Sequence, residues 1–527
     1  MPIFSRFALL LGLVAGVGAM LGPAVAVAEE IRLQLKGGGF EMTGELKSFD
    51  GKRYLIVSPV FGQLTIETER FDCISPNCPT APVALQPPAG VASGQVAIAG
   101  SNTIGNALMP ALIEAYAEAA GLQATKVVGA NPLDMDVKLK SRDGRDVATA
   151  KLARHGSSTA FDALEKGVAE IGMSSRRIKT DEVQRLRAAG LGDMTAPTHE
   201  HIIGLDGLTI IVGPDNPAVS ISIENAAKVF SGQITDWAEV GLPPGPITVY
   251  APQDANGTFE TFNLLVLAPR KLKLTATAKR TENHAEQSDW VAADPLGIGF
   301  VGVAYQRNAK SLNIEAACGL ITRPTKFSMK TEEYPLSRRL YLYTAGTPKT
   351  PLARSLLEFA LSEKAQPVVA AADFIDQKPE TLNFRDQGAR IAYALNAQTE
   401  DFDLASMRTL ITDISKAERL STTLRFEIGS SNLDNKAQQD IRLLASLMQT
   451  PAYKGRELML LGFADAIGSY EANLRLSVQR SRAVEGALRA AGFGGALVKG
   501  YSELAPVACN DTPEQRNFNR RVEVWLR

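Results

Sequence analysis

The chain has 527 residues, of which 45% are hydrophobic and 21% are charged, and its formal net charge is −1. A chain of this length predicts three or four domains rather than a single core. The near-neutral charge argues against a protein that binds nucleic acid electrostatically. The composition is typical of a globular α/β protein.

The first residues have the pattern of a cleaved secretory signal. Arg6 supplies a positive charge, residues 7–20 are apolar apart from glycine, and Ala26-Val27-Ala28 is a small-x-small cleavage site. The apolar run is too short and too rich in glycine for a stable membrane span, and an N-terminal anchor is the alternative. We therefore expect a signal peptide over residues 1–28 and a mature periplasmic chain without a membrane span.

The next segment predicts a small β domain. Residues 29–78 alternate apolar and polar side chains, with glycines at turn positions, as in an antiparallel sheet. Cys73 and Cys78 flank a short turn sequence, so we expect a local disulfide in an oxidising compartment. Cys318 and Cys509 either pair across a domain interface or remain buried thiols.

The rest of the chain changes character three times. A proline-rich linker is expected over residues 79–93, followed by an α/β domain over residues 94–378, where short apolar strands alternate with helices. In residues 379–421, apolar side chains recur at helical spacing, so we expect a helical connector there. Residues 422–527 predict a C-terminal α+β domain. The expected fold class is therefore multidomain α/β.

Several loops of the α/β domain carry small hydroxyl side chains just before predicted helices. Hydroxyl and backbone N–H donors at a helix N-terminus favour anions, although one such loop alone is better explained as ordinary capping. We expect the loops to converge on one oxyanion. The candidate ligands are Ser101, Asn102, Thr103, Ser157, Ser158, Ser174, Arg176, Asn256, Gly257 and Thr258.

These loops, in this order, resemble the periplasmic phosphate-binding proteins of ABC transporters over residues 96–376, as do Val229–Trp237 and Ile298–Val301. The resemblance implies two lobes that close on phosphate about crossing strands, with a transporter permease as a candidate partner. The sequence departs from that family, because Arg176 aligns with its proton-accepting aspartate and Pro252 with its arginine. We expect Arg176 to clamp the anion, with selectivity between phosphate and sulfate left open.

Near the C-terminus, a glycine-bounded loop precedes a long predicted helix. Asp465 lies in the loop, Ser469 is the expected N-cap, and the helix is expected to end before Gly492. With 100° of rotation per residue, Asn473 and Arg480 lie on the same side of the helix, at the edge of its buried apolar face. A carboxylate and a guanidinium placed together can hold a zwitterionic amino acid end.

This stretch resembles the OmpA-like peptidoglycan-binding domain from Leu424 to Arg527, including the closing Asn519-Arg520-Arg521 run. The resemblance implies that Asp465 and Arg480 grip the diaminopimelate side chain of the cell-wall stem peptide, with Asn473 beside them. The protein would then be attached to peptidoglycan or the outer membrane without a covalent link.

The expected function is therefore binding of phosphate or a similar oxyanion, with anchoring to peptidoglycan and no catalysis or cofactor. One alternative is an envelope scaffold or sensor whose middle domain no longer binds solute. A phosphohydrolase is a lesser alternative, suggested by His155 next to Ser157. His199-Glu200-His201 places two imidazoles on one face, but no third metal ligand is near it in sequence, so no metal is expected.

Overall fold

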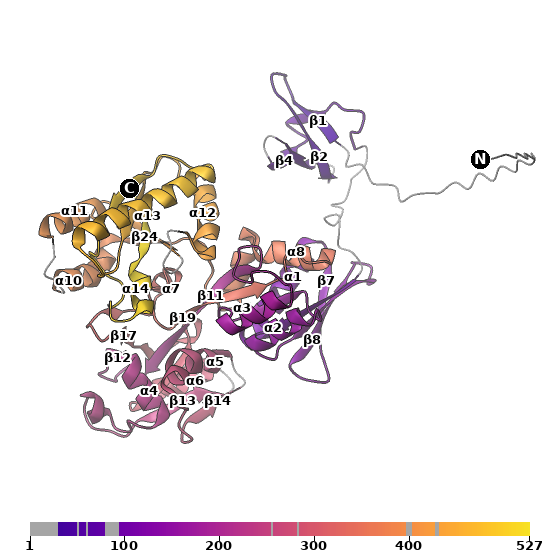
Figure 1. The fold of residues 1–527 in the computed structure, drawn as a ribbon. Coiled ribbons are helices and arrows are strands. Elements are labelled where there is room, and N and C mark those ends of the chain that lie inside the picture. Colours follow the sequence, from indigo (N-terminus) through magenta and orange to yellow (C-terminus); the bar gives the residue numbers. More distant parts are fainter. Residues whose placement is uncertain are drawn as a thin grey trace, which may run out of the picture. The chain divides into compact units, whose positions relative to one another are not determined.

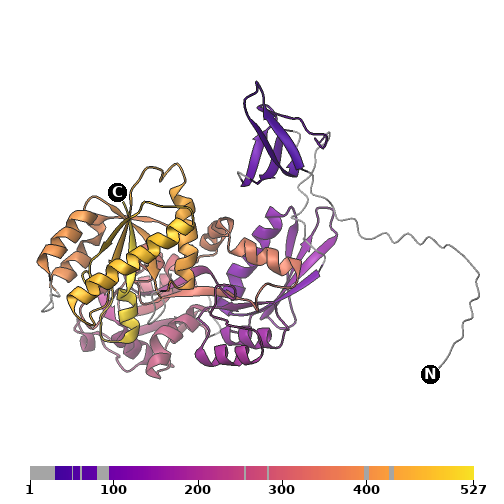
Figure 2. The ribbon, with the colours of Figure 1, turned by 45° about the horizontal axis from the view of Figure 1, so that its top comes forward.

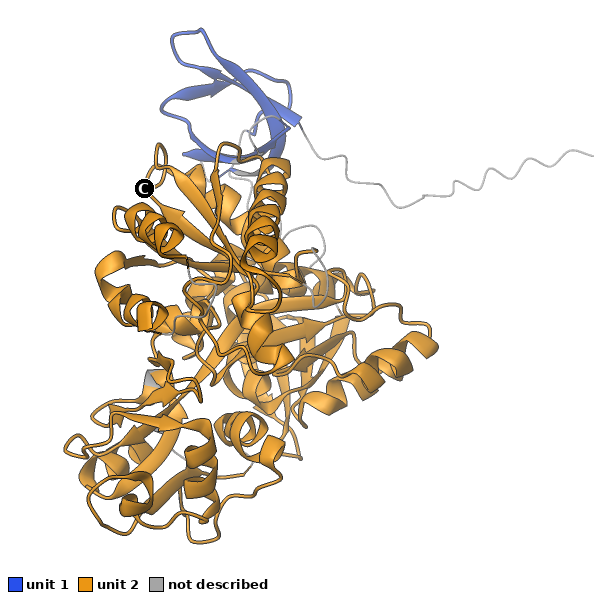
Figure 3. Ribbon diagram, turned by 60° about the vertical axis from the view of Figure 1, so that its left-hand side comes forward, with its two compact units in different colours: residues 1–89 blue, residues 90–527 orange. Residues whose placement is uncertain are grey.

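The computed structural model describes most of the chain. The described residues are 30–49, 52–59, 62–79, 94–254, 257–281, 284–396, 403–426 and 432–527. The expected signal peptide and residues 80–93 of the expected linker lie outside them. The chain divides into two compact units, Met1–Ala89 and Gly90–Arg527 (Figure 3).

The first unit is a five-stranded antiparallel sheet with strand order β4-β3-β2-β1-β5, which confirms the expected small β domain. Its core forms around Ile31, Leu33, Tyr54 and Ile56, because alternate residues of a strand share one face. The strands are β1 (Glu30–Leu35), β2 (Glu41–Phe49), β3 (Arg53–Ser58), β4 (Gly62–Glu67) and β5 (Phe71–Cys73).

The α/β part of the second unit has two lobes with separate hydrophobic cores. Lobe 1 packs around residues such as Ile98 and Leu112, and lobe 2 packs around Phe230, Phe262 and Phe300. Its helices are η1 (Ile104–Leu108), α1 (Met109–Ala119), α2 (Ser157–Glu165), α3 (Thr180–Ala188), α8 (Pro351–Ala360) and α9 (Gln366–Ala371) in lobe 1, and α4 (Ile223–Ser231), α5 (Gly257–Phe262), α6 (His284–Ala293) and α7 (Lys326–Lys330) in lobe 2.

One 11-stranded sheet runs through both lobes, because two long antiparallel strands, β11 and β19, cross between them (Figure 1). This arrangement confirms the two-lobed fold. The strands are β6 (Gly94–Gly100), β7 (Gln123–Val128), β8 (Asp134–Lys140), β9 (Asp146–Ala153), β10 (Ile171–Ser174), β11 (Glu200–Val212), β13 (Thr248–Pro252), β14 (Lys279–Thr281), β15 (Gly297–Gly302), β16 (Lys310–Ser311) and β19 (Ser337–Tyr343). A smaller sheet in lobe 2 contains β12 (Ser220–Ser222), β17 (Asn313–Glu315) and β18 (Ile321–Thr322).

The C-terminal domain is a mixed sheet of order β20-β21-β24-β22-β23, with the long helix α13 lying across it (Figure 2). Helices α12 and α13 share one core with the sheet, and α10 and α11 share another. The elements are β20 (Thr381–Asn383), α10 (Gly388–Asn396), α11 (Leu404–Ile414), β21 (Glu418–Arg425), α12 (Asn435–Met448), β22 (Leu458–Phe463), α13 (Tyr470–Ala490), β23 (Leu497–Gly500), α14 (Pro513–Asn519) and β24 (Arg521–Leu526).

Residues 379–421, expected as a helical connector, include helices α10 and α11 and also contribute to this sheet. Strand β20 and the start of β21 lie in this range and pair with each other. The helices in it bury Met407 and Leu410 against Phe463 of the C-terminal domain. The segment is therefore packed against the domain that follows it. Among the helices that the structure describes, none combines the length and apolar character needed to cross a membrane.

All four cysteines are paired. Cys73 is joined to Cys78, the local pair that the sequence favours. Cys318 of lobe 2 is joined to Cys509 of the C-terminal domain across 191 residues of sequence. Of the two alternatives for this second pair, the structure has the bridge between domains.

A thiol reagent should therefore label none of the four cysteines in the denatured, non-reduced protein and all four after reduction, because a thiol in a disulfide cannot be alkylated. Mass spectrometry of the labelled protein counts the modified thiols. A labelled Cys318 or Cys509 before reduction would contradict the bridge between lobe 2 and the C-terminal domain.

Candidate functional site

The first expected oxyanion loop follows a tight turn at the end of β6. Gly100 has φ +135°, and a Cβ at this position would lie 2.0 Å from the carbonyl oxygen of Met173, so only glycine lets β6 and β10 approach so closely. The backbone N–H of Ser101 donates to the same carbonyl at 2.8 Å. The turn therefore fixes Ser101, Asn102 and Thr103 at the carboxyl edge of the lobe 1 sheet.

This loop contains buried polar atoms without partners. Ser101 is fully buried, and neither its Oγ nor Oδ1 of Asn102 has a hydrogen-bond partner within the described part of the chain. An unpaired buried polar group costs about 1–3 kcal/mol, so native structures rarely leave one empty. These two atoms can therefore form hydrogen bonds with a polar group or a water molecule placed at the loop.

The second and third loops lie at the same edge, because β9 and β10 run parallel to β6 on either side of it. The backbone N–H of Gly156 donates to the carbonyl oxygen of Gly100 at 2.9 Å. Ser157 Oγ lies 3.1 Å from Ser175 Oγ, and the Ser174 hydroxyl donates to the carbonyl oxygen of Arg176 at 2.7 Å. The structure thus brings all the candidates of lobe 1 to one sheet edge.

Arg176 has protein partners in this arrangement. Its guanidinium donates two hydrogen bonds to the Glu182 carboxylate, at 2.8 and 2.7 Å, and one to Ser158 Oγ at 3.0 Å. It also lies over the ring of Phe161, at 5.3 Å from the centroid. The Glu182 carboxylate is therefore a counterion of Arg176, the residue expected to bind the anion.

The candidates of lobe 2 face this edge from the start of α5. The Thr103 hydroxyl donates to the carbonyl oxygen of Gly257 at 3.4 Å, and a Cβ on Gly257 would lie 2.4 Å from Thr103 Oγ1. Glycine is thus needed where the lobes meet. Thr258 follows in α5, and Asn256 lies outside the described residues.

Arg338, which the sequence analysis missed, lies where these two loops meet. It is on β19, directly opposite Asp206 on β11. Its Nη2 donates to Thr103 Oγ1 at 2.8 Å and to the carbonyl oxygen of Gly257 at 3.2 Å, and its Nε donates to Asp206 Oδ2 at 3.2 Å. Arg338 therefore contacts both lobes at once.

The guanidinium of Arg338 has hydrogen-bonding capacity left. Its Nη1 is buried, and no partner for it exists in the described ranges. Burial lowers the pKa of Arg338, while the charge of Asp206 opposes that shift. An arginine titrates so high that the group stays cationic. No local sequence pattern marks this residue, because β19 is far along the chain from every loop that it contacts.

The second expected site forms between β22 and α13. Ser469 caps α13 by accepting from the N–H of Ala472 at 3.3 Å, which confirms the expected helix start. A Cβ on Gly462 would lie 2.0 Å from the carbonyl oxygen of Ser477, so this glycine lets the helix lie directly on the strand. The close packing sets the loop with Asp465 beside the first turns of α13.

Asp465 pairs with an arginine other than the expected one. Its Oδ2 accepts from Nη1 of Arg520 at 2.8 Å, and its Oδ1 accepts from the N–H of Ile467 at 3.0 Å. Asn473 donates to the carbonyl oxygen of Asp465 at 3.0 Å and to Glu503 at 2.9 Å. Arg520 belongs to the closing Asn-Arg-Arg run that the sequence analysis recorded without assigning it to the site.

Arg480 is buried without a counterion. It is 5% exposed, donates to the carbonyl oxygen of Phe463 at 3.3 Å and lies over the ring of Phe426 at 5.5 Å. It forms no ion pair with any carboxylate of the described ranges, and its Nε has no partner there. Burial first, and then the charge of Arg520, lower the pKa of Arg480 to about 10, against the influence of Asp465. A buried cation of this kind favours an anionic ligand.

The two histidines set aside above are accounted for by protein contacts. His199 Nδ1 lies 2.8 Å from Thr198 Oγ1, and His201 Nε2 lies 3.2 Å from Thr344 Oγ1. Burial, and to a lesser extent His199, lower the pKa of His201 to about 4, so this ring is neutral near pH 7. Across the part of the chain with described structure, no three His, Cys, Asp or Glu residues gather as a metal site would need.

The PBP superfamily domain matches residues 86–364, more than half of the chain, so the chain belongs to this superfamily. The OmpA family matches residues 425–520. Protein SphX of Synechococcus elongatus is 29% identical over 218 residues, which cover 39% of this chain and 63% of SphX. Phosphate-binding protein PstS of Staphylococcus haemolyticus is 28% identical over 228 residues, covering 42% of this chain and 69% of PstS.

Solved structures are similar to portions of the chain. An ABC-type phosphate transport receptor from Vibrio cholerae is 21% identical and covers 53% of this chain and 99% of the receptor, with a TM-score of 0.40. The peptidoglycan-associated lipoprotein from Burkholderia pseudomallei is 23% identical and covers 20% of this chain and 89% of the lipoprotein, with a TM-score of 0.19.

Proposed function

We propose that the chain binds phosphate or a closely related oxyanion between its two lobes, without catalysing a reaction. The observation that carries this proposal is the buried, unpartnered Nη1 of Arg338 at the point where Thr103 and Gly257 meet. An oxyanion there would accept hydrogen bonds from Arg338 and from neutral donors such as Ser101. The relatives named for phosphate binding favour phosphate as the ligand.

The assignment of the cation to Arg338 changes the role expected for Arg176. Nη1 and Nη2 of Arg176 both donate to Glu182, whereas Arg338 pairs with Asp206 through Nε and keeps a buried Nη1 without a partner in the described ranges. Arg176 and Ser158 would then position the second loop. Asn256, Gly257 and Thr258 would complete the site from lobe 2.

The C-terminal domain would anchor the chain to peptidoglycan through diaminopimelate. This residue ends in an ammonium and a carboxylate on one carbon, which suit Asp465 and Arg480 respectively. The lack of a counterion for Arg480 supports this role, because a ligand carboxylate would supply one. The ammonium would compete with Arg520 for Asp465. With the signal peptide over residues 1–28, the protein would act in the periplasm, and a permease is a candidate recipient of the oxyanion.

Mass measurement of the natively purified protein tests the first proposal, since a retained oxyanion adds a defined mass. Calorimetry with phosphate and with sulfate then measures selectivity. Absence of binding to both anions would favour an envelope scaffold or sensor. Turnover of a chromogenic phosphoester, tested with and without divalent metal, would favour a phosphohydrolase.

The change Thr103→Val should weaken phosphate binding by about 1–3 kcal/mol, because it removes the hydroxyl that joins Arg338 to lobe 1 while keeping the side-chain shape. Calorimetry at constant pH measures the loss. Thr409→Val, which removes a hydroxyl on α11 of the C-terminal domain, is the matched control. Equal phosphate affinity of both variants and wild type would exclude the Thr103 hydroxyl from the site.

A further inference from the structure

The C-terminal domain is fixed firmly to lobe 2. The Cys318–Cys509 disulfide joins them covalently. Arg419 pairs with Glu333, and the Arg425 guanidinium donates to the carbonyl oxygen of Thr331 at 2.8 Å. The disulfide is a covalent link that prevents the two parts from separating, and the buried ion pair and hydrogen bond add directional contacts between them. Lobe 2 and the C-terminal domain are therefore one mechanical body.

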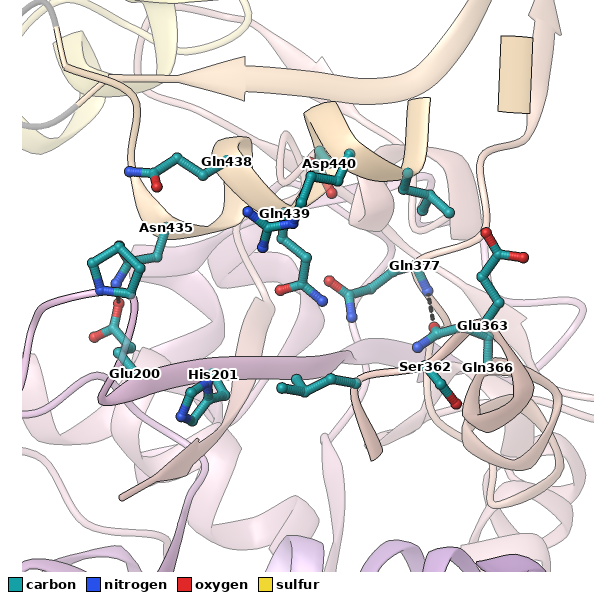
Figure 4. A pocket seen from close by; sticks show the side chains of 14 residues that line it. Glu200, His201, Ser362, Glu363, Gln366, Gln377, Asn435, Gln438, Gln439 and Asp440 are labelled. Atoms are coloured by element: carbon teal, nitrogen blue, oxygen red, sulfur yellow. Dashed lines mark hydrogen bonds between the residues drawn. The ribbon is translucent and has the colours of Figure 1, made fainter. Parts of the chain in front are cut away.

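Helix α12 of this body lies beside the lobe 1 end of β11 (Figure 4). Asn435 donates to Oε1 of Glu200, the first residue of β11, at 2.9 Å. Gln439 donates to the carbonyl oxygen of Ile202 at 3.1 Å, at the point where the β11–β19 register shifts. These contacts between α12 and lobe 1 are hydrogen bonds from neutral amides.

A cavity of about 360 Å³ with both polar and apolar lining residues lies beside these contacts, between α12 and lobe 1 (Figure 4). Gln377 lines it, and its buried Oε1 has no partner among the described residues. The interface between α12 and lobe 1 therefore contains open space and an unpaired polar atom. Closure of the two lobes about β11 and β19 would move lobe 1 against α12.

A chain of side-chain contacts connects the N-terminal end of α12 with both proposed binding sites. Arg338 of the cleft is followed by Arg339, which donates to Oδ2 of Asp434, the N-cap of α12, at 2.9 Å. Leu433, the residue before Asp434, forms a β-bridge with Phe426, and Arg480 lies over the Phe426 ring. Only a few side chains therefore separate the cleft from the cell-wall site.

We propose that the C-terminal domain forms part of the hinge. Helix α12, through Asn435 and Gln439, holds lobe 1 where Arg338 reaches both Thr103 and Gly257, and so raises the affinity of the cleft for its oxyanion. This inference rests on the proposed function for its ligand. In this proposal the C-terminal domain controls oxyanion affinity in addition to anchoring the chain. Binding of the oxyanion is then coupled to the domain proposed to bind peptidoglycan.

The double variant Asn435→Ala/Gln439→Ala tests this in the full chain, since neither residue contacts the cleft or the Asp465 loop. We expect phosphate affinity, measured by calorimetry, to fall at least about fivefold, the lower range of allosteric coupling. We also expect faster amide hydrogen exchange in β11 and β19. Ser446→Ala, an exposed change on the same helix, should match wild type in both measurements.

Each outcome decides the proposal. Unchanged phosphate affinity overturns it, even if exchange becomes faster, because α12 would then support the strands without controlling the cleft. Higher affinity overturns it too, since α12 would then hold the lobes apart. If the wild-type protein binds no phosphate, the proposed function fails, and hydrogen exchange alone tests the role of α12. Exchange rates in β11 and β19 of the double variant that equal those of wild type would overturn that role.

Discussion

Replacing Arg338 with methionine should reduce phosphate affinity by about 2–5 kcal/mol, the usual range for loss of one partner from a desolvated charge contact. The change removes the free Nη1 and the bonds to Thr103 and Gly257, and it leaves the Asp206 carboxylate facing the ligand. Each 1.4 kcal/mol corresponds to about a tenfold weaker dissociation constant, so calorimetry resolves the effect.

The double variant Arg338→Met/Asp206→Asn controls for folding, because it leaves no unpaired buried charge. Its unfolding temperature should be close to that of wild type, while its phosphate affinity should remain below that of wild type. Arg176→Ala should change affinity less than tenfold, and Arg187→Ala on exposed α3 should have no effect. Lost binding in Arg176→Ala combined with normal binding in Arg338→Met would show that Arg176 is the clamp after all.

Asp465→Ala and Arg480→Ala should each abolish co-sedimentation with purified sacculi whose stem peptides contain diaminopimelate. Each change leaves one charge of the ligand unpaired, at an expected cost of about 2–5 kcal/mol. Loss of Arg480 also removes the buried guanidinium that lacks a protein counterion. Circular dichroism and thermal unfolding establish that the variants remain folded.

Arg482→Ala is the matched control, because Arg482 lies on the same helix but is exposed to solvent. It should sediment with sacculi as wild type does. Sacculi with lysine in place of diaminopimelate lack the second carboxylate and should not retain the wild-type protein. If the Asp465 and Arg480 variants sediment as well as wild type, the domain does not anchor the chain through diaminopimelate.

Some features of the proposed oxyanion site could be predicted because they are local. Ser101, Asn102 and Thr103 follow directly on a strand and a glycine turn, and the parallel neighbours of that strand bring Ser157 and Ser174 to the same edge. The helix that carries Asn473 and Arg480 could also be predicted from its N-cap and its periodicity. Short-range rules of strand ends and helix caps suffice for such features.

Pairing between distant charged groups could not be predicted, because it depends on which side chains the fold brings together. Arg338 lies between Thr103 and Gly257 because β19 crosses between the lobes opposite Asp206, and Arg176 donates to Glu182 of the following helix. In the C-terminal domain, Asp465 takes Arg520 as its partner and leaves Arg480 alone.

The sequence by itself therefore determined the fold class and predicted the loops that carry the candidate ligands, since these depend on local periodicity and turn chemistry. Only the tertiary structure decided that Arg338 lies between Thr103 and Gly257, how Cys318 and Cys509 pair, and that α12 contacts β11. The reason is that ion pairs, disulfides and domain contacts join residues far apart in the chain, and no local pattern encodes their distance.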